Sequence, residues 1–440
     1  MHLLRGACLA ACLGTTALAG PELPPPVTDE MFAPVIEAEA RLGQLLFYDP
    51  ILSGNRNISC ATCHHPRFGT SDGTSLALGE GGIGLGPERI ADPENMPEER
   101  VPRNAQGLWN LGATEFTVLF HDGRIEVDER RPSGLRTPLE DEMVQGFASL
   151  LSAQTMFPVL SPDEMAGHYS ENEVSEAVRQ GRLTGLDGAW DRIAVRVRGI
   201  PEYRAMFEAA DPDIASGRPI GFTDISDMIA AFVAFEWRSD DSPFDRHLRG
   251  TAQLEGAAGA GLQLFYGEAG CVSCHSGPFQ TDHDFHAMGV PQFGPGKSER
   301  FELHSRDLGR MRVTGEPEDA YAFRTPSLRN VELTAPYGHT GAYPDLAGFV
   351  AAHADPATAL LSYDRTQAAL PRLPHVSDWE ILDSADETGA IGARLSPGTA
   401  LPEDEVAAIV AFLESLTGDG ASTGRLGIPK SVPSGLPVER

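Results

Sequence analysis

The sequence predicts a mainly α protein made of two related helical domains joined by long connecting loops. Three observations indicate this. Segments with a helix-spaced apolar face occur near both ends of the chain, and one short motif recurs 211 residues later, at His64 and His275. Gly (47) and Pro (34) are abundant among the 440 residues and separate the helices by loops, and no segment is rich in strand signals. This length is enough for two or three ordinary cores.

The first 19 residues have the pattern of a secretory signal peptide. A short basic start, "MHLLR", precedes the apolar stretch "GACLAACLGTTALA", which ends in the small-residue pattern "ALA" at 17–19. "LAAC" at 9–12 resembles a lipoprotein box, but cleavage there would leave an unusually short apolar region, so it ranks second. A buried N-terminal helix is the third alternative, disfavoured by the linker-like "GPELPPP". No later segment has about 20 consecutive apolar residues, so we expect no membrane span in the mature form.

The first helical domain is predicted to span residues 20–245. "RLGQLLFYDPIL" (41–52) begins as an amphipathic helix, and residues 75–102 form a long Gly- and Pro-rich loop. "TDISDMIAAFVAFEWR" (223–238) is a strong helix that Thr223 or Asp224 can cap. Its apolar face consists of Ile225, Met228, Ile229, Phe232 and Phe235.

The second domain, residues 246–440, begins near "SPFDRHLRG" (242–250). "GAGLQLFYGEAG" (259–270) repeats the Leu-Phe-Tyr ending of the first helix, and residues 291–315 form another long loop. "PEDEVAAIVAFLESLTG" (402–418) predicts a final helix with acidic residues in its first turn. The repeat indicates that the two domains are related.

Each repeat is followed by Cys-x-x-Cys-His, in "ISCATCHHP" (58–66) and "GCVSCHSGP" (270–278). This motif is the attachment signature of c-type haem, in which both thiols bond the porphyrin and the histidine ligates iron. The motif cysteines are Cys60, Cys63, Cys271 and Cys274, and the other two, Cys8 and Cys12, leave with the signal. A redox dithiol needs no trailing histidine, and a zinc site would need the two motifs to meet. We therefore expect two cytochrome c-like domains, each with one covalently bound c-type haem on His64 or His275.

The formal net charge of the whole chain is −29. Such an excess of acid argues against binding to nucleic acid or anionic membranes, and it favours partners with a basic face. Solubility alone would also account for it.

From about residue 40 onward the chain resembles the bacterial dihaem cytochrome c peroxidases, and within them the MauG-like branch. The resemblance rests on both haem motifs and on the ordered stretches "LGQLLFYDPILSGNRNISCATCHHP", "FHDGR", "SAQTMFPVLSPDEM", "SPFDRHLRG" and "FRTPSLRNVELTAPYGHTGAY". It implies one open haem that meets H2O2 and one six-coordinate haem that relays electrons. It also implies a protein electron donor or, in MauG-like enzymes, a protein substrate whose tryptophan is modified.

The resemblance implies catalytic roles for Glu164 and Gln154. The family's active-site stretch has Gln, then Pro four residues on, then Glu-Met, which here gives Gln154, Pro158, Glu164 and Met165. Cleavage of an O–O bond needs a group that moves a proton between the two oxygens, and Glu164 is the candidate, with Gln154 positioning water or peroxide. The alternative is that "SPDEM" is merely the start of a helix.

The sixth iron ligands follow from the same resemblance. In the family's cytochrome c peroxidases a histidine sixteen residues past the first iron ligand blocks the peroxide haem, and here that position is Glu80. No histidine occurs between His65 and His121, so the first haem should be open. For the second haem the family spacing from Thr334 reaches His353, with Tyr363 as the fallback. His353 could instead be a surface histidine at a helix end.

Two further features come from the family. A calcium ion is expected between the haems, held by the side chain of Asn104 and the carbonyls of Thr334 and Pro336, oxygen ligands that suit a hard cation. Without the family, Asn104 would be an ordinary loop residue. His121 stands where the family has a tryptophan between the haems, so if MauG-type charge sharing needs that indole, this chain must use another electron route.

Together these observations predict a periplasmic dihaem peroxidase-type oxidoreductase, MauG-like in its protein substrate. A cytochrome c peroxidase that takes electrons from a small redox protein is the first alternative. The second is a non-catalytic dihaem electron carrier.

Overall fold

The computed structural model describes residues 22–297, 304–398 and 400–440, so the predicted signal peptide 1–19, with Cys8 and Cys12, lies outside the described residues. Helices dominate this part of the chain, and its strands are two or three residues long. The prediction of a mainly α fold is confirmed. None of the described helices is long and apolar enough to cross a membrane.

The helices before the second Cys-x-x-Cys-His motif contribute to two cores. They are α1 (Glu37–Phe47), α2 (Cys60–Cys63), α3 (Leu150–Thr155), α4 (Glu173–Arg179), α5 (Ala189–Arg198), α6 (Pro201–Ala210), α7 (Pro212–Ala215), α8 (Phe222–Glu236), α9 (Pro243–Leu248) and α10 (Gly256–Phe265). Those up to α8 contribute to one core, while α9 and α10 contribute to a second core. The later helices are α12 (Met311–Thr314), α13 (Leu346–Ala354), α14 (Pro356–Leu361), α15 (Glu380–Asp383), α16 (Ala385–Gly392) and α17 (Glu403–Glu414).

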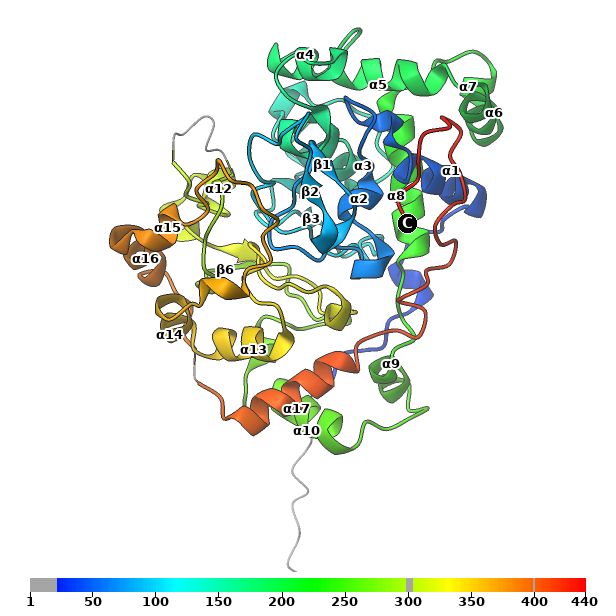
Figure 1. Cartoon of the computed structure of the whole chain (residues 1–440). Coiled ribbons are helices and arrows are strands. Elements are labelled where there is room, and N and C mark those ends of the chain that lie inside the picture. Colours follow the sequence, from blue (N-terminus) through cyan, green and yellow to red (C-terminus); the bar gives the residue numbers. More distant parts are fainter. Residues whose placement is uncertain (1–21, 298–303, 399) are drawn as a thin grey trace, which may run out of the picture.

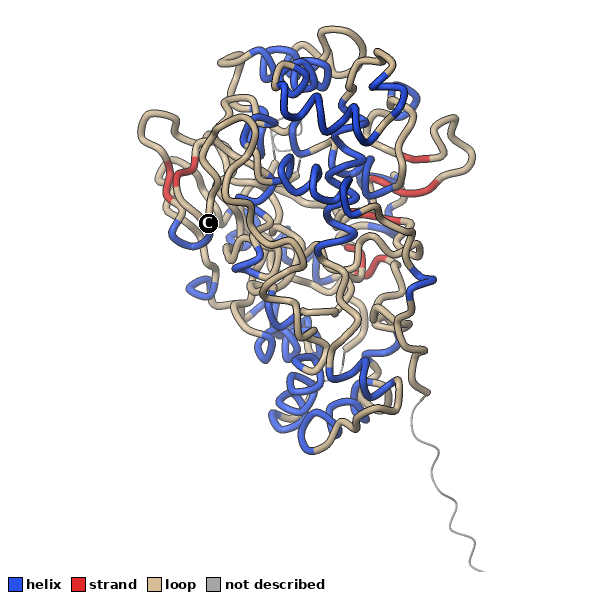
Figure 2. Tube along the Cα trace, turned by 90° about the vertical axis from the view of Figure 1, so that its right-hand side faces the viewer, coloured by secondary structure: helices blue, strands red, loops and turns tan. Residues whose placement is uncertain are grey.

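In the part of the chain that the structure describes, three small antiparallel sheets tie the loops together. β1 (Gly82–Ile83) pairs with β2 (Ile90–Ala91), and β6 (Phe285–His286) pairs with β7 (Phe323–Arg324). The third sheet has the order β3 (Val118–Leu119), β4 (Ile125–Val127), β5 (Leu135–Arg136). Loops fill much of the space between the upper and lower groups of helices in Figure 2.

The internal repeat is a pair of equivalent helix crossings. α1 packs on α8 and α10 packs on α17, which lie at opposite ends of the molecule in Figure 1. A Cβ on Gly43 would overlap the carbonyl of Met228, and a Cβ on Gly261 would overlap that of Ala408. Both glycines lie four residues before the phenylalanine of the repeated Leu-Phe-Tyr segment, and they let the paired helices touch backbone to backbone.

Each crossing anchors its own aromatic core. The ring centroids of Phe47 and Phe232 are 5.2 Å apart at the first crossing, and those of Phe265 and Phe412 are 4.9 Å apart at the second. These are ordinary separations for attractive aromatic pairs. The predicted cap of α8 differs in detail: helix formation begins at Phe222, and the Asp224 carboxylate accepts the N–H of Gly221 at 2.7 Å, from the third helical position.

The C-terminal segment crosses from the second core to the first. It leaves α17 and runs back along α1 and α8, as the red trace in Figure 1 shows. Ala421 and Val432 are buried in the first core, and Glu236 of α8 accepts the N–H groups of Arg425, Leu426 and Gly427 at 3.0, 2.6 and 2.8 Å. The domain boundary at 245/246 stays a prediction.

Candidate active site

The first Cys-x-x-Cys-His motif forms a single helical turn. Cys60 and Cys63 begin and end α2, and neither is in a disulfide. The N–H of Ser59 donates to Thr62 Oγ1 at 3.1 Å, which caps this turn. Residues three apart share a face of a helix, so both thiols can reach one planar group.

His64 has the protonation that iron ligation requires. Its Nδ1 lies 2.9 Å from the carbonyl oxygen of Thr70, and because a carbonyl only accepts, Nδ1 carries the proton. Burial lowers the pKa of His64, while the Thr70 carbonyl and the charge of Glu164 act in the opposite direction. The ring is therefore neutral near pH 7 with its Nε2 lone pair available, the state found in metal-ligating histidines.

The second motif repeats this arrangement on a 3-10 turn, Cys271–Ser273. His275 Nδ1 lies 3.0 Å from the carbonyl oxygen of Gln280, and burial lowers the pKa of His275 as well. Cys271 and Cys274 are not in disulfides. The paired free thiols and the oriented neutral imidazoles of both motifs fit a covalently attached haem.

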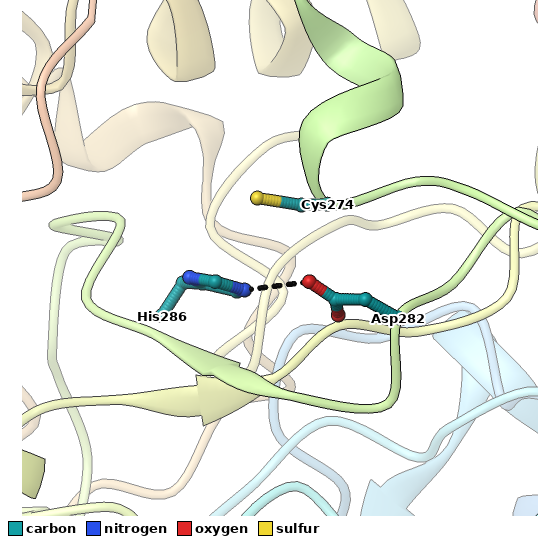
Figure 3. Close-up of side chains that lie close together, drawn as sticks. All are labelled: Cys274, Asp282 and His286. Atoms are coloured by element: carbon teal, nitrogen blue, oxygen red, sulfur yellow. Dashed lines mark hydrogen bonds and ion pairs between the residues drawn. The ribbon is translucent and has the colours of Figure 1, made fainter.

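A carboxylate–imidazole pair lies beside Cys274. His286 Nε2 and Asp282 Oδ2 are 2.9 Å apart, and Cys274 Sγ lies next to both (Figure 3). These three groups are close enough to hold a metal ion. Cys274 belongs to the attachment motif, however, so we assign the cluster to the surroundings of the second site.

The side chains of His353 and Tyr363, the two candidate ligands of the second haem, have different surroundings. His353 lies on α13 and lines a cavity together with Met288, Val290 and Tyr343. Burial, with a smaller contribution from His275, lowers the pKa of His353 to about 4, so the two imidazoles lie within electrostatic reach of each other. Tyr363 donates its hydroxyl to the carbonyl of Ala342 at 2.7 Å. This arrangement favours His353 over Tyr363 as the second ligand, which stays a prediction.

Glu164 lies in an isolated π-helical turn, Pro162–Ala166. The carbonyl of Ser161 accepts the N–H groups of Glu164, Met165 and Ala166, at 3.2, 3.0 and 2.9 Å. The turn stops at Gly167, which has a φ of +91°, so it does not begin a longer helix. Such turns are frequent at functional sites.

Gln154 is on α3, and its side-chain carbonyl is buried without a hydrogen-bond partner. An unsatisfied buried acceptor is costly, which fits a site meant to receive a polar ligand. Glu164 is 23% exposed, and its charge acts on both Cys63 and His64. The structure therefore places Glu164 within electrostatic reach of the first motif.

Glu80 is the centre of a buried polar cluster. Its carboxylate accepts from the side-chain amides of Asn55, Asn57 and Asn95, at 2.9, 2.6 and 2.9 Å. His168 Nε2 lies 3.3 Å from it, and the Glu80 side chain is fully buried. Glu80 occupies the position of the family's blocking histidine, and its side chain is bound within this cluster.

A second buried cluster surrounds His121. Arg103 pairs with Asp122 at 2.8 Å and with Asp307 at 2.6 Å, which joins the two halves of the chain. Burial, followed by the charge of Arg103, lowers the pKa of His121 well below its usual value. Nearby, the rings of His339 and Phe323 stack with centroids 3.7 Å apart. His121 thus stays neutral among buried ions and aromatic rings.

The candidate calcium ligands come from two neighbouring segments. The side-chain amide of Asn104 donates to the carbonyl of Thr74 at 2.8 Å. A Cβ on Gly107 would lie 3.2 Å from the side chain of Thr334, and Pro336 follows through a cis peptide bond. The two segments are therefore adjacent, while calcium binding itself stays a prediction.

Two residues near the first motif were not predicted from the sequence. Glu439, at the end of the C-terminal segment, accepts a hydrogen bond from Thr62, between the two cysteines. Lys297 lies 3.9 Å from Glu164 Oε1. The only sequence signal for Lys297 is the rarity of lysine, since the chain has two, and Glu439 had no such signal.

The fold and the site together define a helical protein with two c-type haem-attachment motifs. A family model described as "Di-haem cytochrome c peroxidase" matches residues 37–253. The chain belongs to this family, and membership implies two haem cofactors.

Relatives come from more than one branch. The methylamine utilization protein MauG of Methylorubrum extorquens is 30% identical over 311 residues, which are 70% of this chain and 66% of that protein. The cytochrome c551 peroxidase of Pseudomonas aeruginosa is 28% identical over 397 residues, 90% of this chain and 83% of that protein. Among solved structures, a MauG-like protein associated with microbial copper homeostasis superposes with a TM-score of 0.57 at 26% identity, covering 93% of this chain and 97% of that chain.

Proposed function

We propose that this chain is a periplasmic dihaem enzyme that uses H2O2 to oxidise a partner protein. Cys60, Cys63 and His64 would hold the haem that meets peroxide. The second haem would be held by Cys271, Cys274, His275 and, on its other face, His353. One observation carries the proposal: Glu164 lies within electrostatic reach of His64, while the asparagine cluster engages Glu80.

When bound, the haem held by His64 would supply the iron-centred redox chemistry that peroxide reduction needs. Glu164 would take a proton from the inner oxygen of H2O2 and deliver it to the outer one, which leaves as water. Gln154, with its unpartnered carbonyl oxygen, would accept a hydrogen bond from the peroxide and orient it. Over a full turnover H2O2 takes up two electrons and two protons and becomes two molecules of water.

The two electrons would come from the partner protein. In the MauG-like case the donor is a tryptophan side chain that becomes modified, and the open first site favours this case. The alternative is a small redox protein, as in a cytochrome c peroxidase, and His121 in place of the family tryptophan gives this alternative weight. The net charge of −29 favours a partner with a basic face in either case.

The absorption and electron paramagnetic resonance spectra of the oxidised holoprotein test the proposal first. We expect one high-spin and one low-spin haem, and two low-spin haems would instead support a non-catalytic electron carrier. Glu164→Gln should slow the reaction with peroxide roughly 100-fold. Glu171→Gln, an exposed acid near the same turn, is the matched control. An unchanged rate in Glu164→Gln would refute the role of Glu164.

A second experiment separates the two kinds of donor. The holoprotein and peroxide are mixed with ferrocytochrome c or with any secreted protein whose gene is found to adjoin that of this chain. A mass change at tryptophan in that protein would support the MauG-like case. Rapid oxidation of ferrocytochrome c without such a change would support the peroxidase alternative.

A further inference from the structure

Lys297 brings the second half of the chain to the candidate peroxide site. The sequence has only two lysines, Lys297 and Lys430, among its 34 basic residues. Lys297 Nζ lies 3.9 Å from Glu164 Oε1, and each of the two side chains is 23% exposed. One scarce ammonium group thus lies beside the carboxylate proposed to move protons.

The segment before Lys297 contacts both halves of the chain. Gly294 donates its N–H to the carbonyl of Asp378 at 2.7 Å and has a φ of +73°. A Cβ at this position would overlap the side chain of Leu76. Only glycine permits this approach without strain, so the path of the backbone three residues before Lys297 depends on Gly294.

Contacts beyond Lys297 fix the same segment. The Gln292 side chain donates to the carbonyl of Asp307 at 2.8 Å and accepts the Asp307 N–H at 3.2 Å. The Asp307 carboxylate is in turn held by Arg103 at 2.6 and 2.8 Å. This chain of contacts ties the base of the Lys297 loop to the buried ion cluster.

Lys297 faces charges of both signs. Burial and the charge of Arg124 lower its pKa to about 8, with a smaller contribution from Arg103, while Glu164 and Asp122 act in the opposite direction. Near pH 7 the side chain is therefore mostly an ammonium ion, and above about pH 8 it becomes a neutral amine.

We propose that Lys297 is a positioning residue of the peroxide site, whose ammonium group holds the Glu164 carboxylate in place and adds a positive charge beside it. This inference rests on the proposed function. When Glu164 takes a proton from H2O2, the hydroperoxide anion HOO⁻ is left, and a nearby fixed cation stabilises that charge. Lys297 keeps its own protons throughout, so the step is balanced between Glu164 and peroxide alone.

The pH dependence of the peroxide reaction tests this role. The rate at which peroxide changes the holoprotein's absorption is measured from about pH 6 to about pH 10. The wild-type rate should fall as the pH rises through about 8, because the cation is lost. Lys297→Met should be about tenfold slower at pH 7 and show no such fall, whereas Lys297→Arg should stay fast above pH 8. Lys430→Met, which changes the only other lysine, should behave like the wild type.

Chemical labelling gives a readout that does not depend on turnover. The holoprotein is treated with limiting acetic anhydride over the same pH range, and labelling at Lys297 is measured by peptide mass spectrometry. Its rate should rise with a midpoint near pH 8, below that of Nα-acetyl-lysine amide in the same solution. Glu164→Gln should lower the midpoint further, because the Glu164 charge favours the ammonium form.

The outcomes separate the two proposals. A wild-type holoprotein that does not react with peroxide would overturn the proposed function and this inference with it. A reactive wild type with an equally reactive Lys297→Met variant would overturn the role of Lys297 alone. A Lys297 midpoint equal to that of the free amine would overturn it as well.

Discussion

The main-chain N–H of Glu80 donates to the carbonyl oxygen of Asp163 at 3.0 Å. This bond joins the loop after the first Cys-x-x-Cys-His motif to the turn that carries Glu164. Gly54 donates its N–H to the carbonyl of Met165 at 2.8 Å, from the segment before the motif. The turn that carries Glu164 is therefore held by segments on both sides of the first Cys-x-x-Cys-His motif.

Glu80→Gln should loosen this turn. All three asparagine amides of the Glu80 cluster donate to Oε1, which the glutamine carbonyl could replace, but an NH2 group would then stand at the Oε2 position, facing the Asn95 amide, which already donates, and His168 Nε2. The buried cluster would lose one acceptor oxygen and its negative charge. In urea denaturation we expect the free energy of unfolding to be about 2 kcal/mol lower than in the wild type. We also expect faster hydrogen exchange at residues 162–166. Glu171→Gln, which removes an exposed carboxylate from the same Asn55, is the control. Equal exchange in both variants would contradict the role of Glu80.

The glycines of the two helix crossings should be intolerant of alanine. A methyl group at Gly43 or Gly261 would overlap a backbone carbonyl, and backbone can move only by separating the helices. We expect Gly43→Ala and Gly261→Ala each to lower the free energy of unfolding by about 3 kcal/mol in urea denaturation. Gly389, inside α16, has open space at its Cβ position, so Gly389→Ala should stabilise by about 0.5 kcal/mol.

Much of this architecture could be predicted from local sequence. The positions of the repeated Leu-Phe-Tyr segments and of the attachment motifs can be read directly from the sequence. The predicted helix at 402–418 is observed as α17 (Glu403–Glu414). Contacts between distant segments could not be predicted. Lys297 meets Glu164 from a loop whose Gly294 fits against Leu76, and periodicity contains no information about such contacts. The turn at Glu164 was equally ambiguous, since Pro-Asp-Glu also begins ordinary helices.

His121 should make the stability of the protein depend on pH. Burial and the cation Arg103 lower the pKa of His121 in the folded state, while in the unfolded chain it titrates near 6.5. Below about pH 6.5 the unfolded chain therefore takes up a proton that the folded chain does not, and stability falls as the pH falls.

His121→Gln should remove this contribution. In urea denaturation between about pH 5 and pH 8, the wild type should lose up to about 1.4 kcal/mol of unfolding free energy per pH unit on the acid side from this one group. The variant should show a correspondingly shallower slope. Parallel curves for the two proteins would mean that His121 is protonated to the same extent in both states.

The attachment of the C-terminal segment to the first core should depend on the carboxylate of Glu236. Glu236 accepts three successive main-chain N–H groups, at Arg425, Leu426 and Gly427, and the Ser434 hydroxyl donates to Asp49 Oδ1 at 2.6 Å further along. In Glu236→Gln one of the two acceptor oxygens becomes a donor that faces N–H groups. The bend at 425–427 would then open more often.

Trypsin can measure this opening, because Arg425 and Lys430 are cleavage sites within the segment. We expect cleavage of the folded holoprotein at these two sites to be roughly tenfold faster in Glu236→Gln than in the wild type, which corresponds to about 1.4 kcal/mol of lost local stability. Glu268→Gln, at an exposed position, should be cleaved at the wild-type rate. Glu439, near the end of this segment, accepts a hydrogen bond from Thr62. Opening of the segment would therefore also uncover the turn between Cys60 and Cys63. If cleavage at Arg425 is unchanged in Glu236→Gln, the segment must be held chiefly by its apolar contacts with the first core.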